Sequence, residues 1–172
     1  MEAFLRYILR WPILEQFIQA YAWVWPLAEV MHFVGLALLI GTVGLFDLRL
    51  LGMGKGLAVA PVRRLLPWGV FGFVLCVASG SLFVGGLWAN IAVHPYDVLI
   101  VNRFLQTKLI FIGLAGLNLL VFNLTGVSRA VDQIGPGEDA PPMAKAIAAA
   151  SLFLWFGVIY VGRLIVWGNL SI

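Results

Sequence analysis

Two ionisable side chains inside an apolar stretch are the residues of this sequence best suited to chemistry. Glu29 and His32 stand three residues apart, so a helix places them on nearly the same face. There the carboxylate can orient or charge-stabilise the imidazole, a side chain that binds metals and carries protons near neutral pH. The pair predicts a ligand-binding or proton-carrying role for His32, and the structural alternative is a polar bridge between helices.

Three more polar residues belong with this pair if the chain crosses a bilayer. Lys108 and Arg163 each lie near an end of an apolar run, at a depth similar to Glu29 and His32, and His94 stands in a connection nearby. Ionisable groups at membrane depth are costly, so several in one layer suggest a shared pocket. In the structural alternative, Lys108 and Arg163 extend to the membrane interface, or Arg163 neutralises Glu29, and His94 is solvated.

The composition indicates that these residues sit in a membrane protein. Hydrophobic residues make up 62% of the chain and charged residues 11%, with a mean hydropathy of +1.01, whereas soluble domains are roughly 45–50% apolar. The net charge of +3 comes from basic residues scattered around apolar runs, which fits membrane flanks and predicts no nucleic-acid partner. The one cysteine, Cys76, excludes an intrachain disulfide and a Cys/His metal motif.

The apolar runs predict an all-α fold, a polytopic four-transmembrane-helix bundle with an N-terminal interfacial amphipathic helix. Residues 1–20 mix basic and apolar positions around Pro12, the pattern of a helix lying along the bilayer surface. Residues 21–172 hold the transmembrane domain, with room for four spans of roughly 20 residues each. The spans are expected at about residues 25–46, 67–88, 103–124 and 144–167.

The flanking residues predict an orientation in a bacterial inner membrane. Basic residues concentrate in the loops between spans one and two and between spans three and four, which places those loops in the cytoplasm and both termini in the periplasm. Tryptophans fall at the two interfaces that this orientation defines. The outer ones are Trp23, Trp25, Trp88 and Trp167, and the inner one is Trp68.

Some polar and small residues predict structural contacts only. Asp47 and Arg49 are expected to pair locally at the end of the first span, and Asn118 to bridge helices from inside the third. Small residues recur where helices could approach closely, which predicts tight packing. They are Gly35, Gly41, Gly44, Ala78, Gly80, Gly113 and Gly116.

Several of these motifs together resemble a known family. They are Trp25-Pro26, Glu29, His32-Phe33-x-Gly35-Leu36, Asp47-Leu-Arg-Leu-Leu-Gly52, Arg103-Phe104, Lys108-Leu109, Ala115-Gly-Leu-Asn118, Val121-Phe122, Ser151-Leu-x-Leu-Trp155 and Gly162-Arg163. The set is similar to an uncharacterised family of small bacterial four-helix integral membrane proteins, catalogued as a domain of unknown function. The resemblance implies the fold and the membrane location and brings no activity. In that family a histidine follows the Val-Phe pair, where this chain has Asn123, so a haem ligand at that position would be missing.

The leading hypothesis is a small inner-membrane redox-type protein of electron transfer, with a b-type haem or a quinone bound near the periplasmic face. His32 would ligate the haem iron or carry a proton to a quinone oxygen, and His94 would complete bis-histidine ligation. Lys108 and Arg163 would meet haem propionates or a quinone carbonyl.

Two alternatives need no redox cofactor. One is a non-catalytic accessory or scaffold subunit of a larger membrane complex, with membrane protein partners. The other is a small transporter component, which would work as a homo-oligomer. Motifs of soluble hydrolases and of di-iron bundles are absent from the sequence, so it does not decide whether the chain is an enzyme.

Overall fold

The computed structural model describes residues 1–91 and 93–165. In these ranges the chain is helical without strands, and four helices are long and apolar enough to cross a membrane. These are α3 (Val24–Leu50), α5 (Leu66–Ile91), α6 (Arg103–Leu124) and α8 (Pro142–Leu164). The predicted all-α, four-helix membrane bundle is therefore confirmed, and the apolar helices place the chain in contact with a lipid bilayer.

The starts of the long helices follow from residues that suit a first turn. Pro67 and Pro142 occupy the first turns of α5 and α8, where a missing N–H costs nothing. Asn102 caps α6, because its side-chain oxygen accepts hydrogen bonds from the amides of Phe104 and Leu105 at 3.0 and 3.1 Å. Its Nδ2 also donates to the carbonyl of Ile165 at 2.9 Å, which joins the start of α6 to the end of α8.

The helix α3 is longer than the hydropathy pattern predicts. It continues past the expected end at Phe46 to Leu50, so Asp47 and Arg49 lie inside its last turns. Gly52 follows with φ +99°, a conformation that favours glycine and that turns the chain into the next loop. The predicted end of the fourth span at Trp167 lies outside the described residues, as does the side chain of Trp88.

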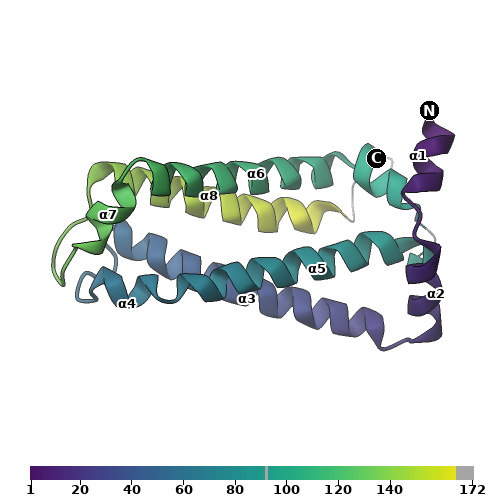
Figure 1. Ribbon diagram of the computed structural model, residues 1–172, viewed down its shortest axis with the longest axis horizontal. Coiled ribbons are helices and arrows are strands. Elements are labelled where there is room, and N and C mark those ends of the chain that lie inside the picture. The colour runs from purple at the N-terminus through teal and green to yellow at the C-terminus, as the bar shows by residue number, and fades with distance from the viewer. Residues whose placement is uncertain (92, 166–172) are drawn as a thin grey trace.

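The four long helices form two pairs, α3 with α5 and α6 with α8 (Figure 1), and the contact between the pairs runs mainly from α3 to α8. Glycines let α3 and α5 touch along their backbones. A Cβ on Gly72 would lie 2.5 Å from the carbonyl oxygen of Gly35, and one on Gly69 would lie 2.5 Å from Oγ1 of Thr42. This first pair therefore closes without space for side chains at the crossing.

The glycine prediction holds for part of its set. Gly35 lies at the close crossing of α3 and α5, as expected. By contrast, a Cβ added at Gly41, Gly113 or Gly116 would meet no atom within 4 Å, so these glycines do not mediate helix contacts among the described residues.

One end of the bundle, which we call the loop end, carries the short helices α4 (Val59–Arg63) and α7 (Val127–Asp132) (Figure 1). Polar bonds there tie the loops of the first helix pair to those of the second. Arg49 donates to the carbonyl oxygens of Gly135 and Glu138 in the connection to α8, and Arg63 bonds to Ser128 and Asp132 of α7. A hydrophobic cluster fills the space beneath these bonds, with Phe46, Leu50, Val59, Phe122 and Val131 among its members.

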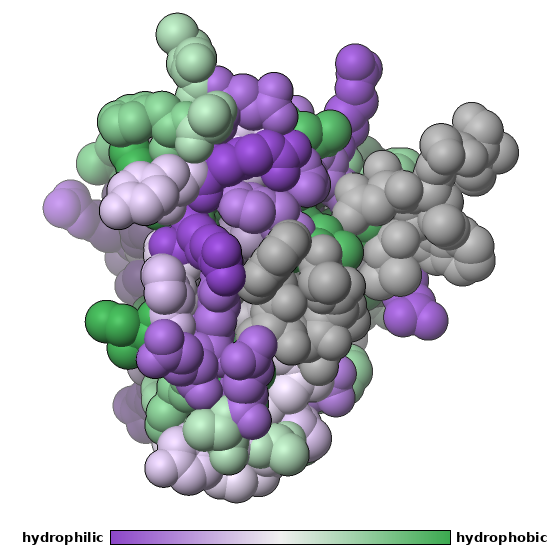
Figure 2. All heavy atoms as spheres, turned by 90° about the vertical axis from the view of Figure 1, so that its right-hand side faces the viewer, coloured by the Kyte–Doolittle hydropathy of each residue, from purple (hydrophilic) through white to green (hydrophobic). Residues whose placement is uncertain are grey.

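The opposite end, which we call the crossing end, is covered by two short helices that lie across the bundle axis, α1 (Glu2–Ile8) and α2 (Pro12–Ala20) (Figure 1). Pro12 starts the second of them, so the predicted amphipathic segment is a broken helix. The side chain of Ile18 is buried against Gly86 of α5. The guanidinium of Arg6 pairs with Asp97 at 2.7 Å, in the π-helical turn η1 (Asp97–Val101) before α6. Figure 2 faces this end and shows hydrophilic side chains gathered across its middle.

Candidate functional site

The imidazole of His32 is half-buried and held by α5. Its Nδ1 lies 2.8 Å from the hydroxyl oxygen of Ser79, and that hydroxyl lies 2.6 Å from the carbonyl oxygen of Leu75, to which it donates. Because the hydroxyl of Ser79 donates its hydrogen to the carbonyl of Leu75, its oxygen accepts a hydrogen bond from Nδ1–H of His32. In its neutral form the ring is therefore the Nδ1–H tautomer, whose Nε2 carries a lone pair. The backbone of Cys76 is a further polar neighbour of the ring, and no hydrogen bond to a described residue is assigned to Nε2.

The ring of His32 also has aromatic and electrostatic neighbours. The ring of Phe83 lies with its centroid 5.4 Å from the imidazole centroid. The ammonium of Lys108, on α6 of the other helix pair, is close enough for its charge to act on both His32 and Cys76. Lys108 is half-buried beside Gly162, and its ammonium has no hydrogen bond or ion pair with the residues the structure describes. His32 and Lys108 thus form one layer across the two pairs.

The other predicted site residues, Glu29, Arg163 and His94, are not joined to His32 or Lys108 by a hydrogen bond or ion pair among the described residues. The side chain of Glu29 is exposed and accepts a hydrogen bond from Nε1 of Trp25 at 3.1 Å. Arg163 is exposed at the end of α8, and among the described residues the ion pairs do not join it to Glu29. Nδ1 of His94 accepts from the amide of Tyr96 at 3.1 Å, which fixes its ring within the connection before α6.

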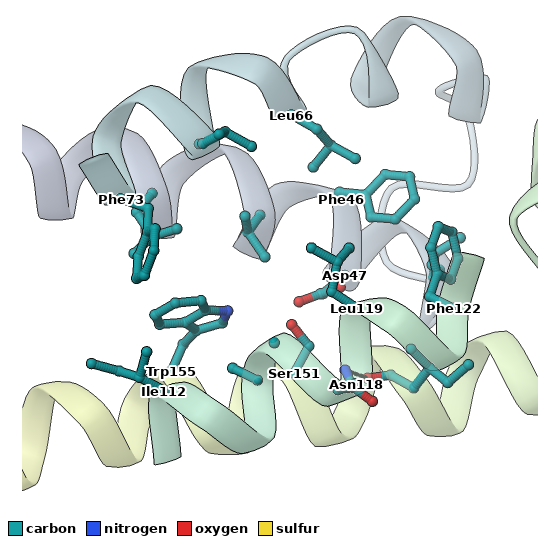
Figure 3. Close-up of a pocket in the computed structure, with 18 residues that line it drawn as sticks. Phe46, Asp47, Leu66, Phe73, Ile112, Asn118, Leu119, Phe122, Ser151 and Trp155 are labelled. Atoms are coloured by element: carbon teal, nitrogen blue, oxygen red, sulfur yellow. Dashed lines mark hydrogen bonds between the residues drawn. The ribbon is translucent and has the colours of Figure 1, made fainter. Parts of the chain in front are cut away.

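A second candidate site, which sequence reasoning missed, is a cavity of about 280 Å³ between the helix pairs, toward the loop end. Figure 3 shows Asp47 of α3 reaching into this space opposite Ser151 of α8. The side chain of Asp47 is buried, with 4% of its surface exposed. One carboxylate oxygen accepts from Ser151, while Oδ2 has no partner among the described residues.

The rest of the cavity wall is almost wholly apolar. Asn118 adds one more polar group from α6, and its Nδ2 donates to the carbonyl of Ile147 at 3.0 Å. This bond joins α6 to α8, so the predicted role of Asn118 as a bridge between helices is confirmed. Aromatic and aliphatic side chains supply the remaining surface, including Phe46, Phe73, Phe122, Leu119 and Trp155 (Figure 3).

The expected local pair between Asp47 and Arg49 is wrong. Residues two apart on a helix point to different faces, and here Arg49 turns to the loop end and bonds to the carbonyl of Leu57 at 2.5 Å. Asp47 turns instead into the cavity. The signal in the sequence was this spacing, because two charges at i and i+2 inside a helix need separate partners.

The comparisons with known proteins add no assignment. Neither family models, curated proteins nor solved structures contain a match to this chain. The resemblance to a family of small four-helix membrane proteins therefore stays a prediction. Among the described residues, no group of three or more His, Cys, Asp or Glu side chains could hold a metal ion.

Proposed function

We propose that this chain is a small redox-type membrane protein that binds a quinone in the layer of His32 and Lys108. The observation that carries the proposal is that an imidazole held by Ser79 and an ammonium without an ion pair among the described residues stand on different helix pairs, within electrostatic range of each other. The free Nε2 of His32 can accept a proton from the hydroxyl of a quinol, and the ammonium of Lys108 can donate to a quinone carbonyl. A quinone site needs a proton acceptor for the quinol hydroxyl, a hydrogen-bond donor for the quinone carbonyl, and apolar surroundings for the ring.

A b-type haem suits the same residues less well. Nε2 of His32 is a competent axial ligand, but bis-histidine ligation needs His94 beside it, and that ring is engaged with the backbone of its own connection. The imidazole of His32 is also packed between α3 and α5, against Ser79 and Phe83. Haem therefore stands as the second cofactor, with a single histidine ligand.

One preparation tests both cofactors. The protein is purified in mild detergent from a host supplied with haem precursor, and its absorption spectrum is recorded oxidised and after dithionite reduction. The quinone proposal predicts no Soret and alpha bands, together with saturable binding of decylubiquinone that His32→Ala and Lys108→Met each weaken and that His94→Ala leaves unchanged. Reducible bands lost in His32→Ala would replace quinone by haem, and equal quinone binding in all four proteins would end the proposal.

A bacterial inner membrane with the loop end in the cytoplasm is part of the proposal. It is supported by the basic residues Lys55, Arg63, Arg64, Arg129 and Lys145 near the loop end. The quinone site then faces the periplasmic half of the bilayer. Reporter fusions at the C-terminus and within residues 135–139 test this orientation, and a C-terminal reporter active in the cytoplasm would reverse it.

An accessory role in a larger complex has one observation in its favour. In the 18-residue apolar stretch of α6, only 6% of the residues are buried inside the protein. The corresponding share is 39% in α3 and in α8. Such a helix offers lipid or a partner helix a long apolar face, and the exposed Gly113 lies on it with open space around it. A photo-crosslinker placed at this position in native membranes would capture a partner if this second function holds.

A further inference from the structure

We propose that the cavity around Asp47 is a binding site for a small amphipathic amine, whose ammonium pairs with the carboxylate while its apolar body fills the space between the helix pairs. Nothing in the proposed quinone site uses this cavity. The proposal rests on three features: a buried carboxylate with an unused oxygen, a cavity that the side chain of Asp47 helps to line, and the chemistry of the cavity wall.

The carboxylate of Asp47 lacks a counter-charge in the described chain. It is buried in the last turns of a helix that could span a membrane, where an unpaired charge is costly and indicates a functional site. The one cation nearby in sequence, Arg49, is committed to backbone carbonyls of the loop end. An ammonium group brought by a ligand would supply both the missing charge and the missing donor for Oδ2.

The other polar atoms of the cavity also call for a donor. The hydroxyl of Ser151 donates to Asp47, and Nδ2 of Asn118 donates to Ile147. When Asp47 is ionised, what remains to contact a ligand is its carboxylate and the amide oxygen of Asn118, and both are acceptors. A quinone, whose polar atoms are acceptors too, is therefore a poor ligand here, whereas an ammonium carries three donors.

The size and lining of the cavity favour an organic cation over a metal ion. Its volume of about 280 Å³ is roughly nine times the share of one water molecule in the liquid. A hard cation needs six or more oxygen ligands close together, and here a few oxygens stand in a wall of apolar and aromatic side chains. Aromatic rings such as Phe73 and Trp155 can hold the apolar body of an amine (Figure 3).

The cavity is separate from the layer of His32. Asp47 and His32 lie on the same helix, about 22 Å apart at 1.5 Å per residue. Between the two levels the rings of Phe73 and Trp155 meet edge to face, with centroids 6.1 Å apart. Loss of one ligand by mutation therefore does not entail loss of the other.

Saturable binding of tritiated 1-adamantylamine to the full chain in lipid nanodiscs tests the proposal, with 1-adamantanol as a neutral competitor of the same shape. Asp47→Asn keeps the size and removes the charge, and Asp132→Asn is the matched control at an exposed carboxylate outside the cavity. We expect Asp47→Asn to weaken amine binding about tenfold to a hundredfold, while Asp132→Asn binds as the unaltered chain does.

A second variant tests the cavity without touching the charge. Gly116 lines the cavity and has room for a side chain, so Gly116→Leu should fold and should weaken the amine and the alcohol alike. Melting temperatures and gel-filtration profiles show that each variant is folded. Equal amine binding in Asp47→Asn and in the unaltered chain, stronger competition by the alcohol than by unlabelled amine, or no saturable binding to folded protein would each overturn the proposal.

Discussion

The interface inside the α3–α5 pair and the space between the two helix pairs differ in how they treat polar groups. Inside the pair, Gly35 and Gly72 bring two backbones into contact, and the polar groups there satisfy one another, as His32 does with Ser79. Between the pairs the helices stand further apart and enclose the cavity. There Oδ2 of Asp47 and the ammonium of Lys108 have no partner among the described residues.

This difference separates contacts that hold helices together from polar groups that are available to a ligand. In a bilayer the lipid tails are as apolar as leucine, so helices associate through close packing and polar bonds. The first pair uses both, and Nε2 of His32 is the atom of this pair that the proposed quinone would use. The two pairs are joined by polar bonds at the loop end and by limited contact along their length, an arrangement that leaves room for a ligand.

The strongest way to break this comparison is to open the first pair. In Gly72→Leu the new Cβ would lie 2.5 Å from the carbonyl oxygen of Gly35. Because that oxygen belongs to the backbone of α3, it cannot move aside as a flexible side chain could. We expect a loss of about 3 kcal/mol of stability, the upper range for an overpacked core. Thermal unfolding in detergent measures it, with Gly116→Leu as the control. Similar losses in both variants would show that the pair is not closed as described.

A second substitution loosens the joint between the pairs. Arg49 is buried, with 1% of its surface exposed, and its hydrogen bonds link the end of α3 to the loops near Leu57 and Gly135. Arg49→Met keeps the apolar stem and leaves buried carbonyls without donors, at a cost of about 2 kcal/mol. Denaturant or thermal unfolding follows the change. The exposed Arg64 provides the control substitution, Arg64→Met, and a loss there as large as in Arg49→Met would contradict the assignment.

The third prediction has the opposite sign. Asp47→Asn keeps an oxygen that can accept from Ser151 and removes an unpaired buried charge. Without added ligand, we expect the variant to be more stable by about 1 kcal/mol, since groups kept for binding are often destabilising. Unfolding midpoints at neutral pH give the sign, with Glu2→Gln as the control at an exposed carboxylate far from the cavity. A less stable Asp47→Asn would mean that the carboxylate has a structural partner.

The smallest expected effect concerns the surface of the loop end. Asp139 bonds to Lys55 at 2.8 Å and to Lys145 at 3.0 Å, and these ammonium groups lower the pKa of its carboxyl from 3.8 to about 2. Because the folded-state pKa is depressed, the stabilisation is full above about pH 4 and is lost as the pH falls toward 2. In Asp139→Asn that part of the pH dependence should vanish. Its size is limited by solvent exposure, so an unchanged profile would show the pairs to be fully screened.

Hydropathy sufficed for the architecture because lipid imposes it. A run of about twenty apolar residues in a bilayer must be helical to satisfy its backbone, so the four long helices follow from composition alone. Pro67 and Pro142 mark helix starts for the same local reason in sequence and structure. The end of α3 was not predicted correctly, because Asp47 and Arg49 were interpreted as marking the end of the helix. In the structure both lie inside it: Arg49 bonds to backbone carbonyls and Asp47 lines the cavity.

The candidate site was harder to predict because it depends on which face of each helix meets which neighbour. His32 was recognised from its residue type, yet its bond to Ser79 joins residues on two helices and no local pattern announces it. Glu29 was grouped with His32 by spacing, and its side chain turns out to be exposed. Asp47 was misread because only the packing of α3 against α8 shows that Ser151, and not Arg49, is its neighbour.

The helices that lie across the crossing end also set an order of assembly. Trp11 and Ile18 pack against Gly85 and Gly86, which leave the ribosome only after α3 and most of α5 have been made. Until then the first twenty residues have no bundle to cover, and their amphipathic sequence gives them a resting place on the bilayer surface. The bundle is therefore closed at this end by a segment that is synthesised before the helices it covers.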